Sequence, residues 1–263
     1  MTQLRIAING AGGRMGQRLV ALAHADEQLV PAAALEAANH PRLGEDAGLI
    51  AGVGELGLPL SAELDARVDV VIDFSLPAGT DTALKLCLEK NLPLVVATTG
   101  LNQQQRDALR AAARRIPVLW APSMSMAVNL TMKLAQVAGE ALADKDADVE
   151  ILERHHRFKE DSPSGTALKF GQIISRAMGQ TSHQHGRQGK PGRRPHEEIG
   201  YHAIRAGDNP GEHTIVFGML GETVELTVRA SNRDCYALGA LAAAKFLAGK
   251  PPGMYGMNEL LGL

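Results

Sequence analysis

Hydrophobic runs and amphipathic stretches alternate over the first 125 residues of the chain. Short β-branched and apolar runs predict strands, and apolar positions that recur every three or four residues predict helices between them. Apolar residues dominate the run at 68–74, which is typical of a parallel strand covered on both faces. The alternation predicts an α/β unit with a doubly wound parallel sheet. Strands are expected at residues 4–9, 29–35, 68–74, 92–97 and 118–121, and helices at 17–25, 80–90 and 103–115.

The pattern changes after residue 125. Residues 200–230 alternate with period two around a turn at 218–221, which predicts antiparallel strands, whereas the polar, Gly/Pro-rich stretch at 180–198 predicts a mobile loop. We therefore expect a second, α+β domain with an open mixed or antiparallel sheet, spanning residues 127–235. The first domain is expected to comprise residues 1–126 and to be completed by 236–263. Further helices are expected at 129–142, 166–178 and 237–247, and a further strand at 149–153.

Composition narrows the class of protein. The chain has 263 residues and a formal net charge of −2, and only 3% of its residues are aromatic, so neither charge nor stacking side chains favour a nucleic-acid partner. No apolar run approaches the roughly 18 residues of a membrane span. Cys87 and Cys235 are too few for a disulfide framework or a zinc site. We expect a reduced, cytoplasmic protein without a signal peptide, a membrane or nucleic-acid partner, or a metal.

The near-neutral total conceals an uneven distribution of charge. Residues 154–205 contain 10 lysines and arginines against 4 acidic residues, a local charge of +6, so the rest of the chain carries −8. Six of the nine histidines lie in the same stretch. This concentration of positive charge indicates a site for an anion.

A glycine-rich turn follows the first predicted strand. Gly10, Gly13 and Gly16 allow the backbone to approach a pyrophosphate at a helix N-terminus, although a tight turn without a ligand has the same pattern. Glu36 strengthens the dinucleotide interpretation, because a carboxylate about 20 residues further on can accept hydrogen bonds from the ribose hydroxyls. It also repels a 2′-phosphate and so favours NADH. Arg14, with His40 and Arg42, keeps NADPH open.

A second constellation lies at residues 153–166. It contains His155, His156 and Lys159 and ends in Ser-Pro-Ser-Gly-Thr, which opens a predicted helix. A histidine delivers a proton near neutral pH, a lysine stabilises a developing anion, and a helix N-terminus binds a carboxylate. The alternative is a solvated basic face followed by a capped helix. A metal site is less favoured, because adjacent histidines on an extended chain point to opposite faces and no third ligand is suitably spaced.

Both segments closely resemble the 4-hydroxy-tetrahydrodipicolinate reductase family, also called dihydrodipicolinate reductases. The resemblance is carried by Ala-Ile-Asn-Gly-Ala-Gly-Gly-Arg-Met-Gly at residues 7–16 and by the highly specific His-His-Arg-x-Lys and Pro-Ser-Gly-Thr-Ala strings within 153–168, and it runs the whole length of the chain. It implies a Rossmann-like first domain and NAD(P)H-dependent reduction of 4-hydroxy-tetrahydrodipicolinate, a small cyclic dicarboxylate, in lysine and diaminopimelate biosynthesis. It also implies a homotetramer built through the open sheet of the second domain.

The resemblance assigns roles to individual residues. His155 corresponds to the catalytic acid/base and Lys159 to the proton-donating lysine, which together protonate the ring after hydride addition at its C4. His156, Gly165 and Thr166 correspond to substrate contacts. Many members have an arginine where Ala37 stands, so the pair Glu36-Ala37 favours NADH, with use of both cofactors expected. The implied cofactor-binding residues are Gly10, Ala11, Gly12, Gly13, Arg14, Met15, Glu36, Ala97, Thr98, Thr99, Ala121, Pro122, Ser123 and Met124.

The sequence departs from the family at two places. Ala97 stands where glycine is usual, and residues 123–129 read Ser-Met-Ser-Met-Ala-Val-Asn instead of Asn-Phe-Ser-Val-Gly-Val-Asn. These positions lie in a cofactor loop and at an expected hinge, so we expect them to affect cofactor preference and domain closure more than the reaction. Two alternatives are a nucleotide-sensing binding protein that has lost its chemistry and a dehydrogenase of the homoserine or aspartate type. The intact segment at 153–166 argues against both.

Overall fold

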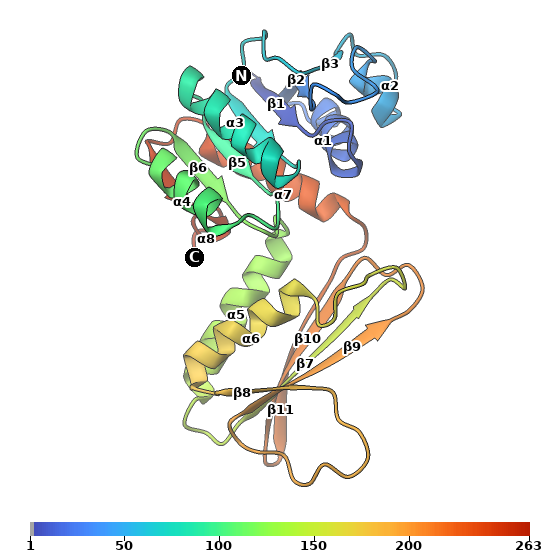
Figure 1. Ribbon diagram of the computed structural model, residues 1–263. Coiled ribbons are helices and arrows are strands. Elements are labelled where there is room, and N and C mark those ends of the chain that lie inside the picture. The colour runs from blue at the N-terminus through green and yellow to red at the C-terminus, as the bar shows by residue number, and fades with distance from the viewer. Residues whose placement is uncertain (1–2) are drawn as a thin grey trace. The chain divides into compact units, whose positions relative to one another are not determined.

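The computed structural model describes residues 3–263, which divide into two compact units (Figure 1). The first unit contains the chain up to Met126 together with Asp234–Leu263, and the second contains Ala127–Arg233. The chain therefore leaves the first unit once and returns to it. The predicted return at residue 236 lies two residues inside the returning segment.

The first unit is built on a seven-stranded sheet in which every paired neighbour is parallel. Its strand order is β12-β6-β5-β4-β1-β2-β3, so the chain starts in the middle of the sheet and extends it in both directions. The strands are β1 (Leu4–Asn9), β2 (Leu29–Leu35), β3 (Leu60–Ser61), β4 (Val70–Asp73), β5 (Leu94–Val96), β6 (Pro117–Trp120) and β12 (Gly253–Tyr255). The helices are α1 (Arg14–Ala25), α2 (Ala47–Ala51), α3 (Pro77–Lys90), α4 (Gln103–Ala112), α7 (Asp234–Leu247) and α8 (Met257–Leu261).

Helices cover both faces of this sheet because successive strand residues point to opposite sides. Ile6 and Ile8 of β1 pack into one core with α1 and α7, whereas Ala7 packs into the other core with α3 and α4. Both cores contain buried aliphatic side chains from every central strand, which explains the nearly continuous apolar runs of the sequence. The predicted doubly wound parallel sheet is confirmed.

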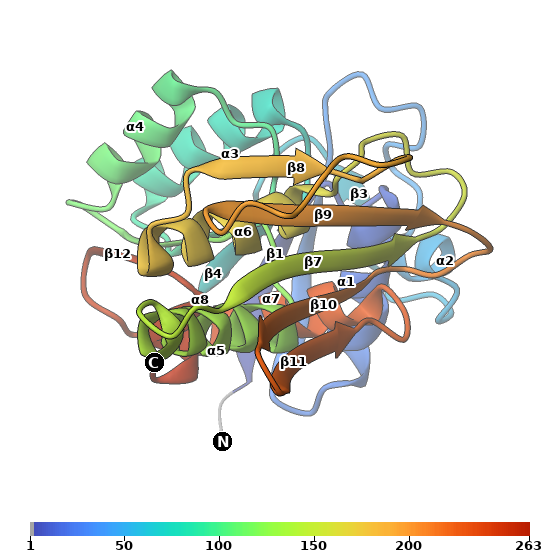
Figure 2. The same cartoon turned by 90° about the horizontal axis from the view of Figure 1, so that it is seen from below.

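The second unit contains a five-stranded mixed sheet in the order β11-β10-β7-β9-β8, seen from the strand side in Figure 2. Helices α5 and α6 cover one face, where Phe170, Phe217 and Ile151 are fully buried. The other face carries Leu152 and Ile204, which remain exposed. The elements are α5 (Met126–Leu142), β7 (Asp148–His155), α6 (Gly165–Met178), β8 (Ser182–His185), β9 (Glu198–Arg205), β10 (Glu212–Met219) and β11 (Glu222–Arg229).

Several local predictions were wrong. Within the stretch at 200–230, which was expected to be antiparallel throughout, β10 and β11 do form an antiparallel pair, but β9 pairs parallel with β7 and β8. The expected mobile loop at 180–198 contains β8, and Arg187 and Arg194 both bind Glu150 on β7. Long-range pairing of this kind leaves no local pattern in the sequence. The short elements α2, β3, β12 and α8 were not predicted, and α1 begins three residues earlier than expected.

No helix in the described part of the chain is both long and apolar enough to cross a membrane.

Candidate active site

The glycine-rich turn joins β1 to α1 at the carboxyl edge of the first sheet. Gly10 has a φ of +83°, and a Cβ on it would lie 2.5 Å from the carbonyl oxygen of Phe74, so only glycine fits there. A Cβ on Gly16 would lie 2.0 Å from the carbonyl oxygen of Gly10. The turn is therefore packed against the end of β4, and its backbone N–H groups lead directly into the first turn of α1.

Glu36 follows β2 and reaches this turn. Its Oε1 accepts a hydrogen bond from the Gly12 N–H at 2.9 Å, which places the carboxylate beside the glycine-rich turn. A Cβ on Gly12 would lie 3.2 Å from that oxygen and 3.0 Å from Cε1 of His40. The structure thus brings Glu36 and His40 to the same end of the turn, although they are distant in sequence from Gly12.

The other predicted cofactor residues lie in the two loops that follow β5 and β6. The Ala97 N–H donates to the Asp73 carbonyl (2.9 Å), and the Ala121 N–H donates to the Val96 carbonyl (3.1 Å), so both loops leave the same sheet edge. Thr98 is buried, whereas Thr99 and Pro122 are exposed. Met124 is only 1% exposed and packs in the core, which leaves its backbone as the part available to a ligand.

These residues fit a dinucleotide. The N-cap of α1 is Gly13, which has no side-chain cap, and the first turn of the helix contains no acidic residue. An anion at this end would meet backbone N–H groups and the positive end of the helix dipole. The carboxylate of Glu36 beside Gly12 is suitably placed to accept hydrogen bonds from ribose hydroxyls.

The second group of predicted residues begins where β7 ends. Successive residues of β7 point to opposite faces, and those at 149, 151, 153 and 155 point to the covered face of the sheet. Glu153 and His155 are therefore buried beside the hydrophobic core. His155 Nδ1 lies 2.5 Å from Glu153 Oε2. Because a carboxylate only accepts hydrogen bonds, Nδ1 carries the proton and Nε2 is the basic nitrogen of the neutral ring.

Glu153 accepts four hydrogen bonds from three residues, one of them from His155. Arg205 on β9 donates to both of its oxygens at 2.7 Å, and the Ser164 N–H donates to Oε1 at 3.0 Å. Burial opposes ionisation of Glu153, but the hydrogen bonds from Arg205 and His155 outweigh it and lower the pKa of the carboxyl group. Glu153 therefore remains a carboxylate at neutral pH and fixes the orientation of His155.

Burial lowers the pKa of His155, and Glu153 counteracts part of that effect. The charges of Lys159 and Arg205 lower the pKa further, which means that both are close enough to act on the ring electrostatically. A Cβ on Gly211 would lie 3.0 Å from His155 Nε2, so this glycine leaves room next to the basic nitrogen. Such a histidine can take up and release a proton at Nε2.

Lys159 and His156 lie in the loop after β7. The ammonium of Lys159 pairs with Asp161 at 2.7 Å, and its side chain is 21% exposed. Nδ1 of His156 is buried, and no hydrogen-bond partner for it exists in residues 3–263. A buried imidazole nitrogen without a partner is costly, and it is therefore suited to meet a ligand.

Gly165 and Thr166 form the first turn of α6. The N-cap, Ser164, accepts a hydrogen bond from the Ala167 N–H (3.1 Å) and contacts Nε2 of His213 (3.0 Å). Burial lowers the pKa of His213 to about 4, so this histidine is neutral at pH 7. The backbone N–H groups of Gly165 and Thr166 belong to the helix N-terminus, where a carboxylate is stabilised.

The sequence interpretation missed Glu153, Arg205, Gly211 and His213 as functional residues. One signal for Glu153 was available: in the alternating pattern of β7 it occupies a position equivalent to Val149 and Ile151, where a charge is expected only with partners. Arg205 and His213 lie on other strands, so only the sheet register brings them to it.

Two further observations concern other kinds of site. Within residues 3–263 no group of three or more His, Cys, Asp or Glu side chains is arranged to hold a metal ion.

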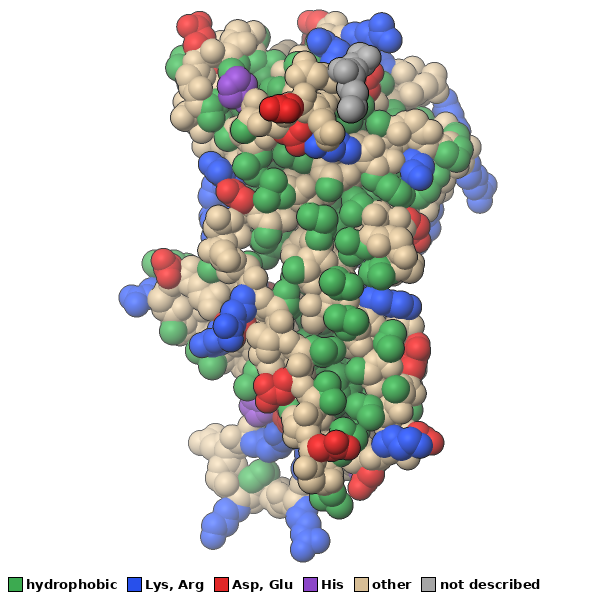
Figure 3. Space-filling view, turned by 180° about the vertical axis from the view of Figure 1, so that it is seen from behind, with side chains coloured by type: hydrophobic (Ala, Val, Ile, Leu, Met, Phe, Trp, Pro, Cys, Tyr) green, Lys and Arg blue, Asp and Glu red, His purple; other side chains and the backbone are tan. Residues whose placement is uncertain are grey.

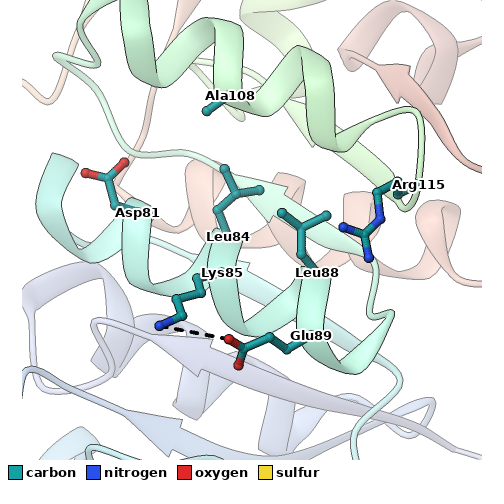
Figure 4. A pocket seen from close by; sticks show the side chains of 7 residues that line it. All are labelled: Asp81, Leu84, Lys85, Leu88, Glu89, Ala108 and Arg115. Carbon is teal, nitrogen blue, oxygen red and sulfur yellow. Dashed lines mark ion pairs between the residues drawn. The ribbon is translucent and has the colours of Figure 1, made fainter.

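A depression of about 400 Å³ lies between α3 and α4, where Leu84 and Leu88 form its floor and Lys85 pairs with Glu89 (Figure 4). None of the predicted site residues lines it.

Comparisons with known proteins cover nearly the whole chain. Family models described as dihydrodipicolinate reductase, N-terminus and C-terminus, match residues 4–124 and 127–261. A 4-hydroxy-tetrahydrodipicolinate reductase from Rhodopirellula baltica is 56% identical over 99% of this chain and 96% of its own length. Another from Alkalilimnicola ehrlichii is 47% identical over 98% and 99%. A dipicolinate-bound dihydrodipicolinate reductase from Paenisporosarcina sp. TG-14 superimposes with a TM-score of 0.78, at 25% identity over 98% and 99% of the two chains.

The parallel sheet, its glycine-rich turn and these matches define an oxidoreductase with an NAD(P)-binding Rossmann fold. The chain belongs to the dihydrodipicolinate reductase family. The resemblance predicted from the two sequence segments is confirmed, and the two alternative classes are set aside.

Proposed function

We propose that the protein reduces 4-hydroxy-tetrahydrodipicolinate to tetrahydrodipicolinate, with NADH or NADPH as the reductant, in lysine and diaminopimelate biosynthesis. The substrate loses water to give an α,β-unsaturated imine, hydride adds to ring C4, and the resulting enamine takes up a proton. The observation that carries this proposal is the Glu153–His155 pair beside the N-terminus of α6, because it combines a proton-transfer group with a site for a carboxylate.

We assign cofactor binding to the first unit and substrate binding to the second. A bound nicotinamide cofactor would supply the hydride. Gly10–Met15 would hold its pyrophosphate, Glu36 its ribose hydroxyls, and the loops at 97–99 and 121–124 its nicotinamide side. The carboxylate of Glu36 favours NADH, and His40 beside Gly12 offers a group that tolerates the 2′-phosphate of NADPH.

His155 and Lys159 have distinct roles in this proposal. Glu153 holds the Nδ1–H of His155, so Nε2, which faces the space kept open by Gly211, takes up a proton to give the imidazolium and then donates that proton to the enamine. The Lys159 ammonium stabilises the negative charge that develops on the substrate ring, and it is a proton donor in the same step. One substrate carboxylate meets the N–H groups of Gly165 and Thr166, and the unpartnered Nδ1 of His156 binds the substrate as well.

The assay supplies the substrate freshly, by condensing pyruvate with aspartate semialdehyde through the preceding synthase, and follows the oxidation of NADH and NADPH in parallel. We expect both to be oxidised, with NADH favoured. His155→Ala should lower kcat by about 10²- to 10⁴-fold while NADH affinity is retained. His196→Ala is the matched control, since His196 is exposed and pairs with Asp146 at 3.2 Å. Absence of oxidation with either cofactor would overturn the assignment.

We further propose a cytoplasmic homotetramer. Exposed apolar side chains on the open face of the second sheet support assembly through that face, because an apolar sheet surface requires cover. The row of Leu130, Leu134 and Val137 along α5 offers a second apolar surface, and Figure 3 shows hydrophobic side chains gathered along this part of the second unit. Light scattering of the purified protein tests the tetramer. Cys87 is a buried free thiol, in keeping with a reducing compartment.

A further inference from the structure

Asp73, the last residue of β4, is a buried carboxylate that the proposed reaction does not use. It is 0% exposed, and among residues 3–263 it forms no ion pair with a lysine or arginine. Removing an unpaired carboxylate from water is costly, and the cost is tolerated only where hydrogen bonds satisfy the group. The position of Asp73 therefore requires an explanation.

Four neutral donors satisfy this carboxylate. Oδ1 accepts from Nδ2 of Asn9 (2.8 Å) and from the hydroxyl of Ser75 (2.5 Å). Oδ2 accepts from the hydroxyls of Thr80 (2.6 Å) and Thr98 (2.8 Å). The donors come from the end of β1, the segment after β4, the first turns of α3 and the loop after β5. Asp73 thus links four chain segments at one edge of the sheet.

Neighbouring donors help to orient two of these hydrogen bonds. The Ser75 N–H donates to the Thr98 hydroxyl oxygen at 3.1 Å, so the Thr98 proton is directed to Asp73. Asn9 donates to the Ser75 hydroxyl oxygen at 3.2 Å, and Ser75 in turn donates to Asp73 at 2.5 Å, with the Leu76 carbonyl as a more distant acceptor at 3.1 Å.

The same edge carries the proposed cofactor site. Asn9 immediately precedes the glycine-rich turn, and Gly10 packs against the backbone of Phe74, the residue after Asp73. Thr98 lies in the loop proposed for the nicotinamide side, and the carbonyl of Asp73 holds the N–H of Ala97 in that loop. One buried residue therefore fixes the glycine-rich turn relative to the nicotinamide-side loop.

We propose that Asp73 is a positioning residue for the dinucleotide, acting through Asn9 and Thr98. This inference rests on the proposed function. The bond to Thr80 has a different purpose, since it anchors α3 and leads to no predicted cofactor contact. Thr80 can therefore be compared directly with Thr98. Both hydroxyls donate to Oδ2 of Asp73, at 2.6 and 2.8 Å, and both side chains are buried.

The test compares Asp73→Asn with Thr80→Val by measuring the NADH dissociation constant in calorimetric titrations and the thermal unfolding of the unliganded protein. Asp73→Asn should weaken NADH binding at least tenfold, because an amide cannot accept from all four donors. Thr80→Val should change NADH binding less than twofold, although it also lowers the unfolding temperature. Dipicolinate binding should be unchanged in both variants. Equal weakening by both variants, or wild-type NADH binding by folded Asp73→Asn, would overturn the proposal.

If Asp73→Asn does not fold, Thr98→Val and Thr98→Ser provide a second route. The valine variant removes the hydroxyl and should weaken NADH binding at least tenfold, and the serine variant restores the hydroxyl and should bind within threefold of the wild type. Wild-type NADH binding by Thr98→Val would contradict the proposal. Failure of the wild-type protein to bind either NADH or NADPH would instead contradict the proposed function, so the two failures are distinguishable.

Discussion

Replacing Glu153 by glutamine tests whether the carboxylate controls the proton chemistry of His155. The side chain keeps its size but loses its charge, and its amide can accept from only part of the set formed by His155, Arg205 and Ser164. The carboxylate raises the pKa of His155 against the effect of burial. Its removal should therefore lower the pKa of His155 further.

The magnitude follows from the contacts that are lost. One charge-assisted hydrogen bond to the imidazolium contributes about 2 kcal/mol, which corresponds to a loss of about 30-fold in kcat. Leaving the guanidinium of Arg205 without its buried partner costs about 3 kcal/mol of folding free energy. If His155 acts as an acid, activity is lost as pH rises through its pKa, so the alkaline limb of kcat/KM should move to lower pH in Glu153→Gln.

The assay records kcat/KM from pH 5.5 to 9 together with the dipicolinate dissociation constant. Glu212→Gln is the matched control: Glu212 is also a buried strand glutamate held by two arginines, Arg154 and Arg229, and it makes no hydrogen bond to His155. We expect the control to lose stability without moving the alkaline limb. A folded Glu153→Gln variant with an unmoved limb and kcat within threefold of the wild type would refute the reasoning.

Three further predictions concern single residues. Lys159→Met should lower kcat at least tenfold with NADH affinity unchanged in direct titration, and equal turnover would exclude a role for the ammonium. Glu36→Ala should reduce kcat/KM for NADH about tenfold and raise it for NADPH, so an unchanged ratio would contradict the ribose assignment. His213 stays neutral down to about pH 4 in the folded protein, whereas the unfolded chain binds a proton below about pH 6.5. As pH is lowered from about 6.5 to about 4, the free energy of unfolding should therefore fall by up to about 3 kcal/mol. His213→Gln should remove this pH dependence, which urea titrations at pH 7, 5.5 and 4.5 would measure.

The sequence was sufficient for the parallel sheet and the glycine-rich turn because both depend on local patterns. Apolar runs mark strands that helices cover on both faces, and Gly10 marks a backbone conformation that other residues rarely adopt. The partners of Glu153 were not predictable, since Arg205 is 52 residues away and reaches it only through the parallel pairing of β7 with β9. Asp73 was overlooked within an apolar run, although an acidic residue inside a buried strand was itself a signal.

The positively charged residues at 154–205 have two different roles, whereas the sequence predicted a single anion site. The first part of this stretch carries His155 and Lys159, to which we assign the proposed reaction. Its later arginines, Arg187 and Arg194, instead bind Glu150, and together with His202 they lower the pKa of that carboxyl group to about 2. The local charge of +6 therefore includes arginines that form ion pairs with the sheet. A count of charges along the sequence does not show which lysines and arginines have acidic partners in the folded protein.

The return of the chain to its first unit determines when that unit becomes complete during synthesis. Helix α7 supplies Ala240, Leu241, Ala244 and Leu247 to the core on one face of the first sheet, and β12 forms its edge. The first 126 residues therefore leave the ribosome with part of their core missing. The second unit is continuous in sequence, so all of its strands and helices emerge before α7 does. The first unit begins to emerge first, but we expect the second unit to complete its fold before the first unit does.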